Sequence, residues 1–137
     1  MVIDLGSGNL ASQLSWIYYY LKPSFDKVNP LISKRLRHEL QVRILDTYMN
    51  EDHFWWMAFN LKPGGLVNNW NPWCNFNVLQ CFFLLENDRD KLAKAVYRTM
   101  TSVDHFINYT HGDGGCEEGP SYWDMLPEDV RLSADAF

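Results

Sequence analysis

Apolar positions recur at helical spacing over much of the chain, whereas the period-two alternation of strands is nearly absent. The first helical segment covers residues 10–21, and the Lys-Pro pair that follows is expected to end it. The second covers residues 30–48. Asn29, just before it, is typical of a helix cap, and Pro30 is typical of a first helical turn. One of its faces is apolar and the other charged, which predicts an amphipathic helix of about five turns. In the first segment, one helical face is shared by Leu10, Leu14, Ile17 and Leu21.

Two further helices are predicted in the second half of the chain. Residues 73–86 hold few polar positions, so we expect a helix that is buried on most sides. Residues 89–108 form a surface helix with one apolar face. Helices joined by short turns imply antiparallel helical hairpins, so the predicted fold class is all-α. Two successive helix pairs resemble units of a larger helical array, in which neighbours cover both faces. The inward face of the last helix is predicted to hold Leu92, Val96, Met100, Val103 and Ile107.

The helical period disappears between residues 50 and 73, where four tryptophans are mixed with prolines and glycines. A loop this long and aromatic usually packs on a scaffold and serves a function. Three asparagines, Asn68, Asn69 and Asn71, surround Trp70. Amide donors and acceptors beside a flat apolar ring suit the hydroxyls and C–H faces of a sugar, and amide donors can also polarise a carboxylate. The alternative is that these side chains cap the start of the next helix.

A second candidate segment covers residues 110–123, where glycines and a proline surround acidic residues and precede Tyr122. A tyrosine acts as general base or acid when its neighbours stabilise the phenolate, although a Tyr-Trp pair also serves packing. His53 and His111 border the two segments and are candidates to line a groove. No two histidines are four residues apart and no HExxH pattern occurs, so neither a zinc site nor a cofactor is predicted.

Charge and composition narrow the class of partner. The 137 residues carry a net charge of −5 without a basic stripe, which argues against tight nucleic-acid binding but leaves an acidic polysaccharide open. No apolar run has the length that a bilayer requires, so no membrane partner is predicted. The N-terminus lacks the pattern of a signal peptide, which leaves the compartment open. The three cysteines have no CxxC spacing and are expected to be small buried hydrophobes: Cys74, Cys81 and Cys116.

Two motifs, in this order and spacing, resemble the heparinase II/III-like polysaccharide lyases. The first is Asn-Asn-Trp-Asn-Pro-Trp at residues 68–73, and the second is Asp-Gly-Gly-Cys-x-Glu-Gly-Pro-Ser-Tyr-Trp at residues 113–123. An apolar helix and a charged helix separate them, and residues 52–57 add to a similarity that covers most of the chain. The resemblance implies that residues 1–137 form a single helical domain, part of an incomplete (α/α) toroid. The loops 50–73 and 110–123 would then line a groove.

The resemblance also implies a reaction. Lyases of this family cleave uronic-acid polysaccharides by β-elimination, and most are secreted or periplasmic. It places the catalytic tyrosine at Tyr122 and the amide that neutralises the uronate carboxylate at Asn68 or Asn69. The remaining residues of the two loops are expected to contact or shape the substrate site: Trp70, Asn71, Trp73, His53, Trp55, His111, Glu118 and Trp123.

The chain departs from the family in one respect, because family members continue with more toroid helices and a β-sandwich domain that complete the groove. We therefore expect a fragment or a shortened relative, inactive when isolated, which associates with itself or needs a C-terminal region. Two alternatives stay open. A helical-toroid glycoside hydrolase would need two carboxylates, for which Asp113, Glu117 and Glu118 are the candidates. A non-catalytic glycan-binding or assembly module would keep the aromatic groove alone.

Overall fold

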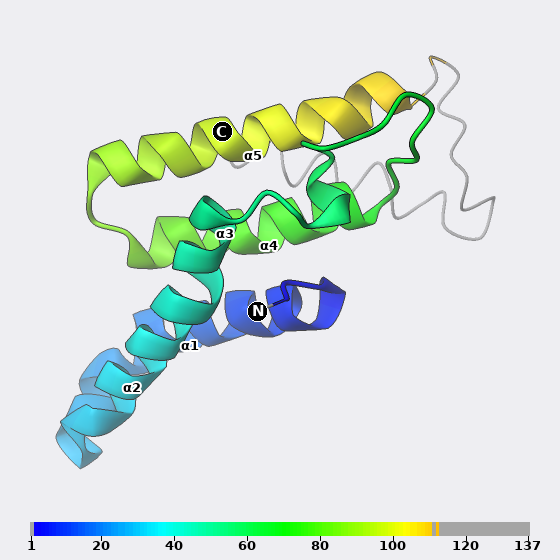
Figure 1. Cartoon of the computed structure of the whole chain (residues 1–137). Helices are drawn as coiled ribbons and strands as arrows, with labels where there is room; N and C mark the ends of the chain where they lie inside the picture. Colours follow the sequence, from blue (N-terminus) through cyan, green and yellow to red (C-terminus); the bar gives the residue numbers. More distant parts are fainter. Residues whose placement is uncertain (1, 111, 113–137) are drawn as a thin grey trace.

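The computed structural model describes residues 2–110 and residue 112, and the regular structure of this part is entirely helical (Figure 1). No strand occurs among the described residues, which confirms the all-α prediction. Two helical hairpins make up most of it, and a π-helical turn and a 3₁₀ turn complete the order of elements. The α-helices are α1 (Leu5–Val28), α2 (Pro30–Leu40), α3 (Asp46–Asn50), α4 (Trp70–Leu85) and α5 (Arg89–Tyr109).

The first hairpin joins α1 and α2 through Asn29, whose Oδ1 accepts a hydrogen bond from the amide of Leu31 at 2.9 Å. This confirms the predicted cap at the start of the second helix. The predicted end of the first helix was wrong, because α1 continues through Pro23 to Val28. Asp26, on the turn after the proline, is bonded by Lys22 and by Ser33 of α2. These contacts hold the last turn helical although the proline lacks a donor.

The helix predicted over residues 30–48 is one continuous rod from Pro30 to Asn50 with a π-helical turn, η1 (Gln41–Leu45), between α2 and α3. The wider turn shifts the register of the apolar face by one residue. Both Ile44 and Leu45 are buried as a result, and Tyr48 of α3 is wholly buried.

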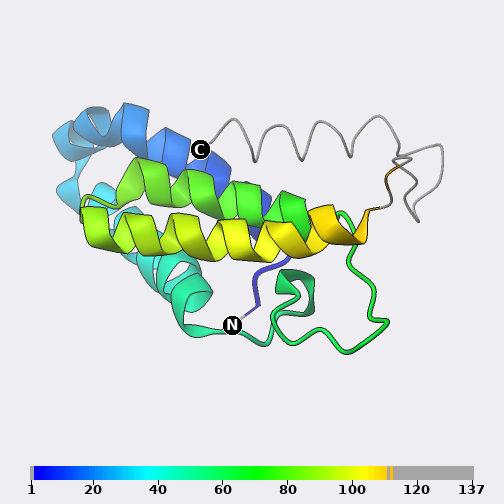
Figure 2. The ribbon, with the colours of Figure 1, turned by 90° about the horizontal axis from the view of Figure 1, so that it is seen from above.

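Helix α4 lies between α1 and α5, as the two ribbon views show (Figures 1 and 2). Most sides of α4 are buried, as expected from its composition, and the buried residues include polar as well as apolar ones. The face that α1 turns toward α4 is lined by small residues rather than leucines, which was not predicted. Leu10, Ile17 and Leu21 are 55%, 41% and 45% exposed. The buried residues of α1 are Gly8, Ala11, Ser12 and Ser15.

The same correction applies to α5, which runs antiparallel to α4 in the second hairpin (Figure 2). Val103 faces inward as predicted, but Met100 and Ile107 are about half exposed. Small polar residues occupy their place because α4 presents amide groups that need partners. The buried residues of α5 are Ala95, Thr99, Ser102, Val103 and Phe106. No helix among the described residues has the length and apolar character that crossing a membrane requires.

Candidate functional site

The aromatic loop between α3 and α4 packs on the end of the second hairpin where α4 begins and α5 ends (Figure 1). Its anchor is Trp56 in the 3₁₀ turn η2 (Trp55–Met57), whose indole N–H donates to the carbonyl of Ile3 at 2.8 Å. The hydroxyl of Ser102 in α5 donates to the carbonyl of Met57 at 2.9 Å. Both contacts are buried, so the loop is held by the core as its tryptophans indicated.

Arg98 of α5 provides a second anchor for the same loop. Its guanidinium donates to the carbonyls of Tyr48 at 2.9 Å and of Glu51 at 2.7 Å, and it forms an ion pair with Asp52. The guanidinium carbon also lies 4.6 Å from the centre of the Phe59 ring. A planar group with several donors suits this combination of carbonyls, carboxylate and ring. The position of Arg98 fixes where the loop leaves α3.

Asn68 and Asn69 lie at the start of α4, and both are half-buried. The Oδ1 of Asn68 accepts a hydrogen bond from the amide of Trp70 at 3.1 Å, so Asn68 fits the capping interpretation. Asn69 occupies the N-cap position, but its side chain makes no capping hydrogen bond. The two asparagines therefore have different surroundings, and the amide nitrogen of Asn68 is not used by its capping contact.

A pair of indole rings, one exposed and one half-buried, lies beside Asn68. Trp55 is 54% exposed, and its ring centre lies 5.0 Å from that of half-buried Trp70, with the planes tilted by 43°. Because Asn68 bonds the backbone of Trp70, an amide and two flat apolar rings share one small surface. This is the combination that binds the hydroxyls and the C–H face of a sugar.

Asn71 and Trp73 point into the protein rather than toward this surface. Asn71 is wholly buried, and its Nδ2 donates to the carbonyl of Trp56 at 2.8 Å and to the carbonyl and hydroxyl of Ser102. The prediction that Asn71 contacts substrate is therefore corrected, because its amide nitrogen serves the core. The Nε1 of half-buried Trp73 is inaccessible and has no hydrogen-bond partner among the described residues.

His53 is exposed and lies 2.9 Å from a carboxylate oxygen of Glu51. Its ring centre is 4.5 Å from that of Phe54, so His53 stands on the outer surface of the loop. The other predicted site residues lie outside the described part of the chain: His111, Glu118, Tyr122 and Trp123.

Two further predictions concern metals and cysteines. Within residues 2–110 and 112, no group of three or more metal-ligating side chains occurs. Cys74 and Cys81 are wholly buried free thiols, as predicted, and Cys116 lies outside the described residues. Burial raises the pKa of Cys74 to about 12 and that of Cys81 to about 11, so both stay protonated at neutral pH.

Sequence reasoning missed Arg98, Ser102 and Tyr48, which position the candidate surface without reaching it. The available signal was the accumulation of asparagines in an otherwise apolar helix, Asn71, Asn75 and Asn77. Buried amides need partners, and these had to come from neighbouring elements.

Comparisons with known proteins do not assign the chain to a family. No protein-family model matches the sequence. No curated protein matches it either.

Proposed function

We propose that this chain forms one edge of the catalytic groove of a polysaccharide lyase of the heparinase II/III type, which cleaves uronic-acid polymers by β-elimination. The observation that supports the proposal best is the surface at the start of α4, where Asn68 adjoins the half-buried Trp70 and the exposed Trp55. The motif resemblance at residues 68–73 and 113–123 supplies the reaction class.

The chemistry assigned to these residues is a proton transfer assisted by a neutral amide. Asn68 or Asn69 donates a hydrogen bond to the uronate carboxylate, which stabilises the charge that builds up there when C5 loses its proton. Tyr122 takes that proton as its phenolate and then protonates the departing glycosidic oxygen. The C4–O bond breaks and a C4–C5 double bond forms, so no water is consumed. The indole pair Trp55 and Trp70 holds the neighbouring sugar ring.

The test follows from the product. An unsaturated uronate absorbs ultraviolet light, so the chain and any longer natural form are incubated with heparan-type and alginate-type polymers while absorbance is followed. Absorbance that grows, and that is abolished in Tyr122→Phe and in Asn68→Ala or Asn69→Ala, supports the proposal. Asn87→Ala is the matched control, because Asn87 is an exposed asparagine at the other end of α4. New reducing ends without absorbance would show hydrolysis instead and overturn the lyase assignment.

A non-catalytic glycan-binding module is the second candidate, favoured by one observation. Trp55 and Trp70 can stack on a sugar without help from an ionisable group. Glycan binding that is lost in Trp55→Ala, with neither absorbance nor reducing ends, would support this candidate. Hydrolysis would need two carboxylates, and its candidates Asp113, Glu117 and Glu118 lie outside the described residues.

A further inference from the structure

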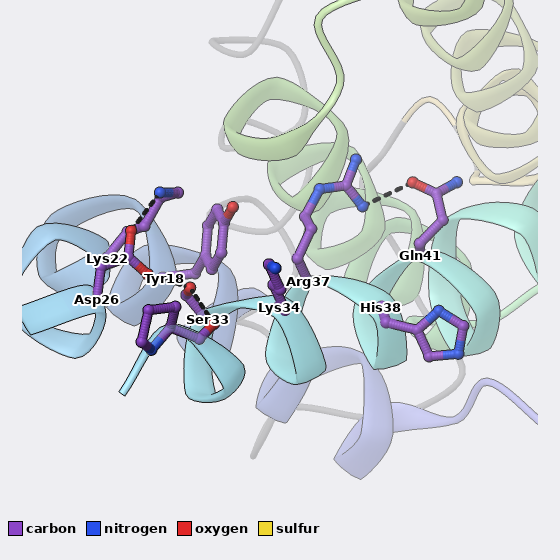
Figure 3. A pocket seen from close by; sticks show the side chains of 9 residues that line it. Tyr18, Lys22, Asp26, Ser33, Lys34, Arg37, His38 and Gln41 are labelled. Carbon is purple, nitrogen blue, oxygen red and sulfur yellow. Dashed lines mark hydrogen bonds and ion pairs between the residues drawn. The ribbon is translucent and has the colours of Figure 1, made fainter. Parts of the chain in front are cut away.

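An open groove lies between the second half of α1 and α2 (Figure 3), and its volume is about 640 Å³. This size is within the range of small-ligand sites. The groove lies at the opposite end of α4 from Asn68, because Arg37 on its wall donates to the carbonyl of Leu85, the last residue of α4. The 16 residues of α4 span about 24 Å. The groove is lined by Tyr18, Lys22, Asp26, Pro30, Ser33, Lys34, Arg37, His38 and Gln41.

The charge of the lining is opposite to that of the chain. Lys22, Lys34 and Arg37 against the single acid Asp26 give +3 − 1 = +2 with His38 neutral, whereas the whole chain carries −5. A basic recess in an acidic protein attracts anions locally despite the net charge.

The single acid is already engaged. Lys22 Nζ lies 2.6 Å from Asp26 Oδ2, and the hydroxyl of Ser33 donates to the other oxygen of the same carboxylate. The hydrogen bond from Lys22 is the main cause that lowers the pKa of Asp26, followed by that from Ser33. Asp26 is therefore ionised at neutral pH and pairs directly with Lys22, so one carboxylate faces the three cations of the groove, Lys22, Lys34 and Arg37.

Neither Lys34 nor Arg37 forms an ion pair with a carboxylate of the described residues, although the charge of Lys34 contributes to the lowered pKa of Asp26. The Nη1 of Arg37 donates to Gln41 Oε1 at 2.6 Å and its Nη2 to the carbonyl of Leu85 at 3.1 Å, and both acceptors are neutral. These bonds fix the guanidinium beside the groove, and Figure 3 shows the one to Gln41. Lys34 is exposed on the same wall and makes no hydrogen bond or ion pair with the described residues. The fixed guanidinium of Arg37 and the exposed ammonium of Lys34 thus face the same space.

The same groove has apolar walls. The rings of Tyr18 and Pro30 line it together with the cations, and Figure 3 shows Tyr18 beside them. An aromatic ring next to basic groups suits a ligand with an anionic substituent and a ring whose C–H groups can stack on the aromatic side chain. A sugar bearing a sulfate or a carboxylate has this composition.

We propose that this groove is an auxiliary binding site for an acidic saccharide, whose sulfate or carboxylate lies between Lys34 and Arg37 and whose ring lies against Tyr18. The choice of a saccharide rests on the proposed function. The choice of an anion rests on the groove alone.

The test measures binding to the whole chain by calorimetry or NMR titration with three probes: a sulfated heparin-type disaccharide, inorganic sulfate and neutral cellobiose. The disaccharide should bind, cellobiose should not, and added salt should weaken the complex. Lys34→Gln should raise the Kd for the disaccharide by about fivefold, as expected for one exposed charge. We expect the substitution to leave the fold intact, because Lys34 is exposed and no hydrogen bond or ion pair of its side chain is lost. Lys94→Gln, the same charge change on an exposed residue of α5, is the control.

Each other outcome overturns the proposal in a recognisable way. Equal weakening by Lys34→Gln and Lys94→Gln would show a general charge effect without a site. If cellobiose bound as tightly as the disaccharide, the site would not require an anionic group. If inorganic sulfate bound as tightly as the disaccharide, the site would not recognise the sugar ring. The lyase proposal is tested separately, because Asn68→Ala should leave disaccharide binding in this groove unchanged. Binding that depends on Lys34, together with new reducing ends but no ultraviolet absorbance from the chain or its longer natural form, would overturn only the proposed function.

Discussion

The phenolic hydroxyl of Tyr48 donates a hydrogen bond to Oδ1 of Asn75 at 2.6 Å, and both side chains are wholly buried. The same hydroxyl lies 2.9 Å from the hydroxyl of Thr99, and Asn75 Nδ2 donates to the hydroxyl of Ser102 at 2.8 Å. A single buried network therefore joins α3, α4 and α5. Burial raises the pKa of Tyr48 above the ordinary range of a phenol, so its proton is present at physiological pH.

Tyr48→Phe should destabilise the fold by about 1–3 kcal/mol, because Asn75 loses its buried donor and Thr99 loses its partner. Urea denaturation followed by circular dichroism measures the change. Tyr97→Phe is the control, since Tyr97 is 73% exposed on α5 and should change stability by less than about 0.5 kcal/mol. Equal effects of the two substitutions would show that the network contributes nothing.

Arg98→Lys should lower the free energy of unfolding by about 1–2 kcal/mol. A lysine keeps the charge but cannot bond the carbonyls of Tyr48 and Glu51 and the carboxylate of Asp52 at once. Faster hydrogen exchange of amides in residues 51–60 than in α4 would locate the loss in the loop. Arg89→Lys, at an exposed position at the start of α5, should leave both measurements unchanged. Uniform acceleration across the chain would contradict a local role for Arg98.

The helices were predictable because their periodicity and caps are local properties. The cap at Asn29, the burial of α4 and the continuous rod from Pro30 were all recognisable from short stretches. The inward faces were less predictable, because apolar spacing assigned Leu10 and Met100 to the core and the structure exposes both. Small residues lie at the contact of α1 and α4 because the two helices pack closely. This closeness is a property of the tertiary structure and could not be predicted from the spacing of apolar residues in α1.

The candidate surface was predictable in its composition but not in its division of roles. Asn68, Asn69 and Asn71 looked alike in sequence, yet Asn68 caps a turn and Asn71 binds the core. Their difference depends on contacts with residues 15 to 31 positions away, such as Trp56 and Ser102. Local motifs carry no information on such pairings.

Gly8→Ala should stabilise the protein by about 0.5–1 kcal/mol, because alanine has the higher helix propensity. A β-carbon added at Gly8 would lie 3.7 Å from Cβ of Asn77, an ordinary van der Waals distance. Thermal denaturation of Gly8→Ala measures the effect. Gly6→Ala, which tests propensity near the exposed start of the same helix, should also stabilise. Loss of stability in Gly8→Ala alone would mean that α1 and α4 lie closer than their contact at Asn77 indicates.

The two buried thiols should make the protein less stable as the pH rises above about 9. An unfolded thiol loses its proton near the ordinary pKa of 9.0, whereas folding raises the pKa of Cys74 to about 12 and of Cys81 to about 11. The folded state then binds more protons than the unfolded state, so the free energy of unfolding falls with pH.

The stabilisation is complete below pH 9 and is lost toward pH 11–12, by at most about 1.4 kcal/mol per pH unit for each thiol. Urea denaturation under reducing conditions at pH 7, 8, 9 and 10 gives the slope. Cys74→Ala combined with Cys81→Ala should flatten the decline between pH 9 and 10, even though each substitution lowers stability at pH 7 by removing a buried sulfur. If the double variant declined as steeply as the unmodified protein, the decline would have to come from other titrating groups.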